Sequence, residues 1–299
     1  MRGLHTPVRA IRRRVFKEVA QLGFKADEDT LLADMEAIPY AIVNEDSEKY
    51  RESVYRARAI VRERLRLAMG LSLRPENKPV HLTAGVEASN ISEKYYEPPL
   101  MQVIPSACES CEENKYEVSN ICKGCLAHPC QEVCPKDAIS MVNGRSYIDQ
   151  EKCIKCGKCK SVCPYDAIAK KERPCQKACG VNAIKSDKMG RAYIDNEKCV
   201  SCGMCMVSCP FGAISDKSQI FQLARALSEG ENVIAEIAPA FVGQFGDNIT
   251  PRNIKAALRE LGFSEVYEVA LGADIGAIAE AHHYVCLLYT SDAADELDG

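Results

Sequence analysis

Apolar residues recur at helical spacing in two stretches near the N-terminus. After Thr6 and Pro7, a pair typical of a helix start, the first stretch is predicted to be a helix that Gly23 ends. A second helix is predicted over about residues 46–70. Its arginines are interpreted as a solvated helix face, with binding to an acidic partner as the alternative: Arg51, Arg56, Arg58, Arg62, Arg64 and Arg66. Residues 1–107 are therefore expected to form a helical segment and a linker.

The C-terminal part of the chain alternates between strand and helix patterns. The runs 233–238 (VIAEIA) and 266–270 are strand candidates, and Thr250-Pro251 opens a helix between them. Another helix is expected to follow the second strand. Strand, helix and strand in this order predict a parallel βαβ unit within residues 215–285.

The middle of the chain, residues 108–214, contains an internal repeat. GRSYIDQEKCIKCGKCKSVCPYDAI (144–168) matches GRAYIDNEKCVSCGMCMVSCPFGAI (190–214). Just before each of them, PCQEVCPKDAI (129–139) matches PCQKACGVNAI (174–184). Two copies of one module are therefore expected to follow one another in tandem.

Composition and charge narrow the chemistry of this repeat. Hydrophobic residues make up 46% of the chain and the net charge is −4, so most of it should fold and nucleic acid is not an expected partner. No apolar run approaches the roughly 18 residues of a membrane span, and the N-terminus lacks the pattern of a signal peptide. We therefore expect a cytoplasmic protein that does not enter a membrane. Sixteen of its 17 cysteines lie in the middle region, where metal binding is favoured over disulfides.

Two stretches, 153–163 and 199–209, have the spacing Cys-x2-Cys-x2-Cys followed by Cys-Pro. Such a loop can present three thiolates to three irons of a 4Fe–4S cube, while the fourth thiolate comes from elsewhere. Zinc sites more often use paired Cys-x2-Cys knuckles, so zinc is the alternative that this spacing disfavours. The spacing predicts bound 4Fe–4S clusters.

These motifs, over residues 122–214, resemble bacterial-type two-cluster ferredoxins, in which the cysteine before proline binds the other cluster. The resemblance implies crossed ligation. In the first module it gives two ligand sets: Cys122, Cys125 and Cys130 with Cys163, and Cys153, Cys156 and Cys159 with Cys134. In the second module it gives one complete set, although a glycine replaces the usual proline after its last member: Cys199, Cys202 and Cys205 with Cys179.

The remaining cysteines form a fourth set with an upstream pair: Cys108 and Cys111 with Cys175 and Cys209. All sixteen cysteines are then used, and four 4Fe–4S clusters are expected. Two alternatives stay open for this set, a zinc knuckle and an exchange of roles between Cys108/Cys111 and the pair Cys122/Cys125. Lysines in one cysteine loop are interpreted as solvated charge, with contact to an acidic carrier as the alternative: Lys155, Lys158 and Lys160.

The segment after the repeat resembles the opening of the catalytic domain of iron-only (FeFe) hydrogenases. The matching landmarks are Ala238-Pro239, LRELGF (258–263) and Ala273-Asp274. The N-terminal helices and the pattern ACESC…CKGCLAHPC…CP resemble the monomeric branch of that family. The resemblance implies one-electron relay toward a catalytic diiron cluster in the intact protein. It also implies a soluble ferredoxin or similar one-electron carrier as partner.

That family binds its catalytic cluster through four further cysteines in later motifs, whereas this chain has only Cys286 after Cys209. We therefore expect no hydrogen turnover by this polypeptide and assign no catalytic residue. The run CLLYTSDAADE (286–296) resembles a translated sequencing adapter. Residues 286–299 are accordingly expected to be a non-native tail on a truncated chain, with a natural polar tail as the alternative.

The expected fold class is α+β. It combines N-terminal helices, two tandem ferredoxin modules that bind two clusters each, and an incomplete βαβ fragment. The expected function is electron transfer through four 4Fe–4S clusters, as the N-terminal part of a hydrogenase-like oxidoreductase. Two alternatives are a standalone ferredoxin-like electron-transfer subunit and a hydrogen-sensing homologue.

Overall fold

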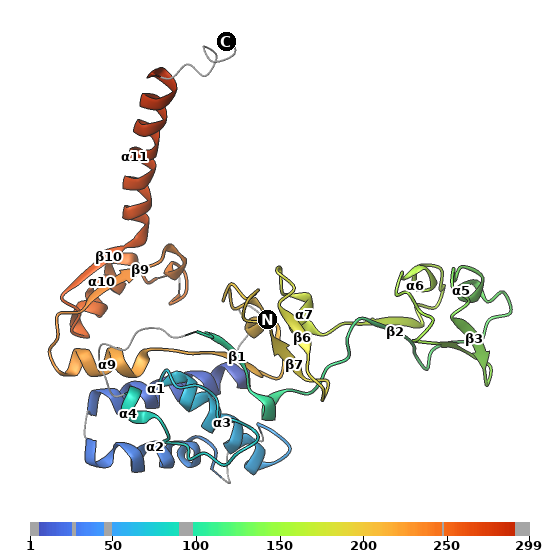
Figure 1. The fold of residues 1–299 in the computed structure, drawn as a ribbon, viewed down its shortest axis with the longest axis horizontal. Helices are drawn as coiled ribbons and strands as arrows, with labels where there is room; N and C mark the ends of the chain where they lie inside the picture. The colour runs from blue at the N-terminus through green and yellow to red at the C-terminus, as the bar shows by residue number, and fades with distance from the viewer. Residues whose placement is uncertain (1–5, 26–27, 45–49, 90–97, 247, 291–299) are drawn as a thin grey trace.

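The computed structural model of the protein describes residues 6–25, 28–44, 50–89, 98–246 and 248–290. Figure 1 shows a bundle of helices, two small modules of short strands and helices, and a C-terminal part that includes a long helix. The fold is therefore α+β, as predicted. No helix within those ranges combines the length and the apolar character that a membrane crossing requires.

The helix bundle has an apolar core to which segments before and after the cysteine-rich modules contribute. Phe221, Met35 and Leu65 are almost completely buried in it. Burial of this apolar surface is the main force that holds such helices together. The helices that supply the core are α1 (Pro7–Lys25), α2 (Glu28–Ile42), α3 (Val54–Ala68) and α9 (Ile220–Ser228).

Gly23 does not end the first helix, contrary to the prediction, because α1 continues to Lys25. Its role is close packing. A methyl group added to Gly23 would lie 2.7 Å from the carbonyl oxygen of Phe221 and 2.8 Å from the Cβ of Ala224. The missing side chain therefore lets α1 and α9 approach one another closely.

Two other predictions for the bundle also differ from the structure. The second predicted helix is α3, which begins at Val54, and residues 45–49 of the predicted start lie outside the described residues. The helix α2 lies within the segment expected to be helical, but no separate helix is predicted there, and Pro39 stands inside it.

Both cysteine-rich modules are built on one plan. A central hairpin is flanked by a pair formed by the module's first and last strands, and all these pairs are antiparallel. The first module contains β2 (Lys115–Val118), α5 (Pro129–Glu132), β3 (Ile139–Val142), β4 (Arg145–Ile148), α6 (Lys158–Ser161) and β5 (Ile168–Lys171). The second contains β1 (Met101–Val103), α7 (Pro174–Lys177), β6 (Ile184–Ser186), β7 (Ala192–Ile194), α8 (Met204–Ser208) and β8 (Ile214–Asp216).

The first module is inserted into the second rather than placed before it. Strand β1 pairs with β8, with Val103 opposite Ile214, yet β1 precedes the whole first module in the chain. The expected tandem arrangement therefore holds for the sequence repeat but not for the fold. The start of the second module lies in the expected linker, which also contains α4 (Val86–Ser89) and the 3-10 turn η1 (Pro105–Ala107). A three-residue strand is too short for its periodicity to be recognised.

The predicted βαβ unit is present in the C-terminal part. Its parallel strands β9 and β10 place Ala235 opposite Val266, and a capping box between Thr250 and Asn253 starts the helix between them. The last helix starts at Val269, directly after the second strand, and so begins earlier than predicted. The elements are β9 (Ile234–Ile237), η2 (Pro239–Phe241), α10 (Pro251–Glu260), β10 (Glu265–Glu268) and α11 (Val269–Thr290).

Candidate iron–sulfur sites

Three of the four predicted cysteine sets each surround a cavity of their own. The first cavity is lined by Cys122, Cys125, Cys130 and Cys163. The second is lined by Cys134, Cys153, Cys156 and Cys159. The third is lined by Cys108, Cys111, Cys175 and Cys209. The upstream pair Cys108/Cys111 therefore faces the second module, as the fourth set required, and not the first.

The remaining set is held together by the core of the second module. Cys205 is buried in this core with Ile184 and Ile194, and Cys179 and Cys199 pack against the same cluster. Cys202 is exposed and lies close enough for its charge to act on Cys205. The structure thus brings the second module's own cysteine loop together with the cysteine that the repeat predicted.

The first two cysteines of each set share one backbone turn. The residue before the second cysteine of the set has a positive φ in all four sets: Ser110 (47°), Gly124 (57°), Lys155 (59°) and Ser201 (54°). The loop that starts at Cys108 therefore has the backbone of the loop at Cys153, although it lies outside the detectable repeat.

The fourth cysteine of each set is followed by a second recurring turn. Three residues later the backbone is left-handed, at Asp137, Asp166, Asn182 and Gly212. The next residue is an alanine whose N–H points at the cysteine sulfur, at 3.3, 3.4, 3.2 and 3.4 Å in that order. The turn after Cys179 has this geometry even though Gly180 replaces proline. An N–H directed at sulfur stabilises negative charge on a thiolate, which is the form that binds metal.

The third cysteine of each set is buried on a short helix, at Cys130, Cys159, Cys175 and Cys205. Burial raises the pKa of Cys175 to about 12, and the charge of Cys209 adds to the effect. Burial likewise raises the pKa of Cys205 to about 11. Without metal these thiols are protonated at neutral pH, so metal binding must release their protons.

The cavities provide a test of whether a cubane fits. Within the described ranges, no three Cys, His, Asp or Glu side chains converge on a point suited to a single metal ion. In each of the three cavity-forming sets, the cysteines are spaced around an apolar hollow. In the first module, Ile139 and Ile148 line the hollow of the Cys153 set, and Val118 and Ile168 line that of the Cys122 set. Four sulfurs around such a hollow, with N–H groups directed at them, fit a 4Fe–4S cluster.

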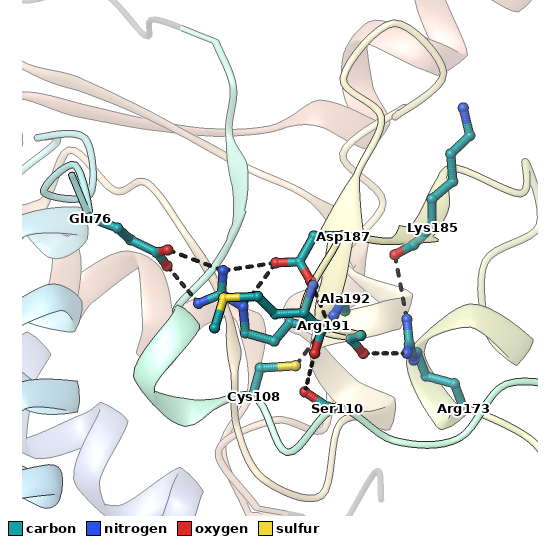
Figure 2. A network of polar contacts seen from close by, with 10 residues as sticks. Glu76, Cys108, Ser110, Arg173, Lys185, Asp187, Arg191 and Ala192 are labelled. Atoms are coloured by element: carbon teal, nitrogen blue, oxygen red, sulfur yellow. Dashed lines mark hydrogen bonds and ion pairs between the residues drawn. The ribbon is translucent and has the colours of Figure 1, made fainter.

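Arginines hold the set of Cys108, Cys111, Cys175 and Cys209 in place. Arg173 is only 3% exposed and donates to the carbonyl oxygens of Cys111 and Gly190, at 2.8 Å each. Figure 2 shows Arg191 between the carboxylates of Glu76 and Asp187, next to the N–H of Ala192 that points at the Cys108 sulfur. This network ties the segment after α3 to the edge of the site.

Arg51, just before α3, and Arg56 and Arg64, within it, do not form a solvated face, so that interpretation is wrong for these three. Arg51 donates to the carbonyl oxygen of Phe211 at 2.7 Å, and Arg64, which is 3% exposed, donates to that of Gly212. Arg56 donates to the carbonyl oxygen of Ser106 at 2.8 Å. These side chains bind the turns beside Cys108 and Cys209, and Arg51 and Arg56 also pair with Glu109. Sequence patterns do not indicate such contacts, because the acceptors are backbone carbonyls.

Comparison with known proteins agrees with these sites. Residues 122–173 match the LdpA Fe-S cluster-binding domain, and residues 192–215 match the 4Fe-4S binding domain. Residues 231–294 match the C-terminal domain of the iron only hydrogenase large subunit. The chain is an iron–sulfur protein related to hydrogenases. The last match and α11 both extend into the segment expected to be a non-native tail.

Similar curated proteins include ferredoxins and an electron transport protein. An uncharacterized ferredoxin of Methanocaldococcus jannaschii is 33% identical over 99 residues, which are 27% of this chain and 63% of that protein. The electron transport protein HydN of Escherichia coli is 37% identical over 71 residues, 23% of this chain and 41% of HydN. A 7Fe ferredoxin of Hydrogenibacillus schlegelii is 43% identical over 53 residues, 18% of this chain and 68% of that ferredoxin. The chain thus spans less than two thirds of the length of the first two relatives.

Proposed function

We propose that this chain relays single electrons through four 4Fe–4S clusters, as the N-terminal part of an oxidoreductase of the iron-only hydrogenase type. The observation that supports it best is the grouping of cysteines into the sets that crossed ligation requires, with one pair of recurring turns in every set. When bound, a 4Fe–4S cluster accepts and donates one electron. The proposed partner is a soluble ferredoxin or similar one-electron carrier, and the proposed location is the cytoplasm.

The chain's own residues have three tasks in this proposal. The sixteen cysteines hold the metal, and the alanine N–H groups at 3.2–3.4 Å stabilise charge on four of the sulfurs. Isoleucines such as Ile139, Ile168, Ile184 and Ile214 are buried beside the cysteines and limit the access of water. Lower access of water and more hydrogen bonds to sulfur are the means by which a protein sets a cluster's reduction potential.

The arrangement of the modules supports a route for the electrons. The first module projects away from the helix bundle, while the second lies against it (Figure 1). Strand β8 of the second module leads into α9 and then into the hydrogenase-related segment. We infer that electrons pass between an outer site in the first module and an inner site in the second, next to the hydrogenase-related part.

An electron-transfer subunit without hydrogen chemistry is the second candidate. The names of the relatives, ferredoxins and an electron transport protein, favour it. Reading the native gene through and beyond codon 285 separates the two candidates. Four further cysteines in hydrogenase motifs would support the first candidate, and a natural stop codon would support the second.

A redox titration tests the relay itself. We expect the anaerobically reconstituted chain to take up about four electrons, one for each cluster, with the rhombic EPR signals of reduced 4Fe–4S centres. The variant Cys111→Ser should lose one of these centres, while Cys286→Ser, which changes an exposed thiol outside the four sets, should keep them all. Uptake of two electrons or fewer by the unmodified chain, or no effect of Cys111→Ser, would contradict the proposal.

A further inference from the structure

The two matched cysteine loops have the same backbone but different charge. The loop CIKCGKCK begins at Cys153, and its counterpart CVSCGMCM begins at Cys199. The φ angles agree, with 59° at Lys155 against 54° at Ser201, and the glycines two positions later also agree. The first loop has lysine at the three positions where the second has Ser201, Met204 and Met206. The fold of the loop therefore does not require the lysines.

The three lysines of this loop are exposed and unpaired. Among the described residues, none of them forms an ion pair: Lys155, Lys158 and Lys160. Several other lysines are paired within the protein, among them Lys170 with Glu172 and Lys185 with Asp195. The charge of the three loop lysines is available to a partner.

The loop also presents an apolar side chain and a predicted cluster ligand to solvent. Ile154 is 55% exposed, and Cys156 is exposed between the lysines. Figure 1 shows α6, which carries Lys158 and Lys160, on the first module and away from the helix bundle, with α5 and β3 farther out. The surface formed by residues 154–160, here called the lysine loop, is therefore open to a partner and adjoins the cavity of Cys134, Cys153, Cys156 and Cys159.

We propose that the lysine loop is the docking surface for a small acidic one-electron carrier protein, such as an acidic ferredoxin. This inference rests on the proposed function and names the place where the carrier meets the relay. A carrier with an excess of carboxylates complements the three unpaired ammonium groups, which steers its approach and orients it. Ile154, exposed on the same loop, supplies an apolar contact. In the encounter the carrier loses one electron and the adjoining site gains it, with no proton or bond exchanged.

The second module provides the test variant. Replacing the lysines with the residues at the matched positions gives the triple variant Lys155→Ser, Lys158→Met and Lys160→Met, which the backbone of that loop already accommodates. The control changes three exposed lysines elsewhere in the same way: Lys17→Ser, Lys78→Met and Lys188→Met. Both variants lose the same charge, so a difference between them reports position.

The experiment measures binding of a purified acidic two-cluster ferredoxin to the reconstituted full chain, anaerobically, at low and high salt. We expect the association rate of the loop variant to fall about tenfold at low salt and to lose most of its salt dependence, while the control variant changes by less than about twofold. Equal binding of the ferredoxin by the loop variant and the unmodified chain would overturn the docking proposal. It would also be overturned if the chain bound anionic vesicles instead of the ferredoxin and the loop variant lost that binding. Iron content and dithionite reduction of the same samples report separately on the proposed function.

Discussion

The guanidinium of Arg173 donates two hydrogen bonds, of 2.8 and 3.0 Å, to the carbonyl oxygen of Cys111, 62 positions earlier in the chain. Between these two residues the chain forms the whole first module. Arg173 therefore closes the gap that the insertion makes in the second module. It fixes the loop of Cys108 and Cys111 opposite Cys175 and Cys209, the other half of the set.

Replacing Arg173 should prevent cluster binding by this cysteine set and leave the other three sets unaffected. The variant Arg173→Gln loses a buried cation and its bonds to the carbonyl oxygens of Cys111 and Gly190, which leaves both acceptors unpaired. We expect the reconstituted variant to bind about four fewer iron atoms per chain than the unmodified protein. The exposed Arg252→Gln serves as the control and should bind the full amount. Full iron content in Arg173→Gln would show that the hydrogen bonds do not hold the site.

Close packing at Gly23 gives a second prediction. In Gly23→Ala the new methyl group meets the backbone of α9, so the variant should be less stable by about 1–3 kcal/mol despite the better helix propensity of alanine. The matched control is Gly272→Ala in α11, where an added Cβ has no neighbour within 4 Å. This change should leave stability equal or raise it by up to about 1 kcal/mol. Thermal unfolding followed by circular dichroism measures both, and equal stability of the two variants would refute the packing role.

The turn at Gly124 gives a third prediction. A methyl group there would overlap the carbonyl oxygen of Gly144, and the positive φ of 57° is itself unfavourable for alanine. Gly124→Ala should therefore destabilise the first module by more than about 1 kcal/mol and shorten the lifetime of its visible absorption in air. Gly180→Ala has open space at its Cβ and should behave like the unmodified protein. Indistinguishable bleaching rates would contradict this account of the loop.

The resemblance to two-cluster ferredoxins predicted the four ligand sets, and the structure groups the cysteines in the same way. The insertion of one module into the other was not predicted, since the strand β1 that starts the second module has only three residues. Arg51 and Arg64 show the same limit. Their acceptors are the backbone carbonyls of Phe211 and Gly212, whose position depends on the tertiary fold. Gly23 illustrates a third case, in which a residue typical of helix ends is used for packing.

A short motif follows the fourth cysteine of each set, and its role became clear only from the structure. The runs CPKDAI, CPYDAI, CGVNAI and CPFGAI share Asp, Asn or Gly three positions after cysteine, followed by Ala-Ile. The structure explains this pattern as a left-handed residue and an N–H directed at sulfur, with the isoleucine buried beside the site. Asp, Asn and Gly are the residues that adopt this backbone most readily.

Removal of metal should affect the parts of the chain unequally. The core of the helix bundle contains no cysteine among the described residues, whereas the cores of both modules include several. We expect chelation under oxidising conditions to abolish the module structure and to leave most of the helical circular dichroism of α1, α2, α3 and α9. Proteolysis should then cut within residues 112–210 first. Loss of the helical signal together with the metal would show that the bundle depends on the clusters.

The central claim is that the sixteen cysteines of residues 108–209 hold four 4Fe–4S clusters. Iron and acid-labile sulfide, measured per chain after anaerobic reconstitution, test it most directly. The account predicts about sixteen of each, four for every cluster, with zinc absent. About eight of each, or stoichiometric zinc in place of iron, would contradict the assignment of the cysteines to four cubanes.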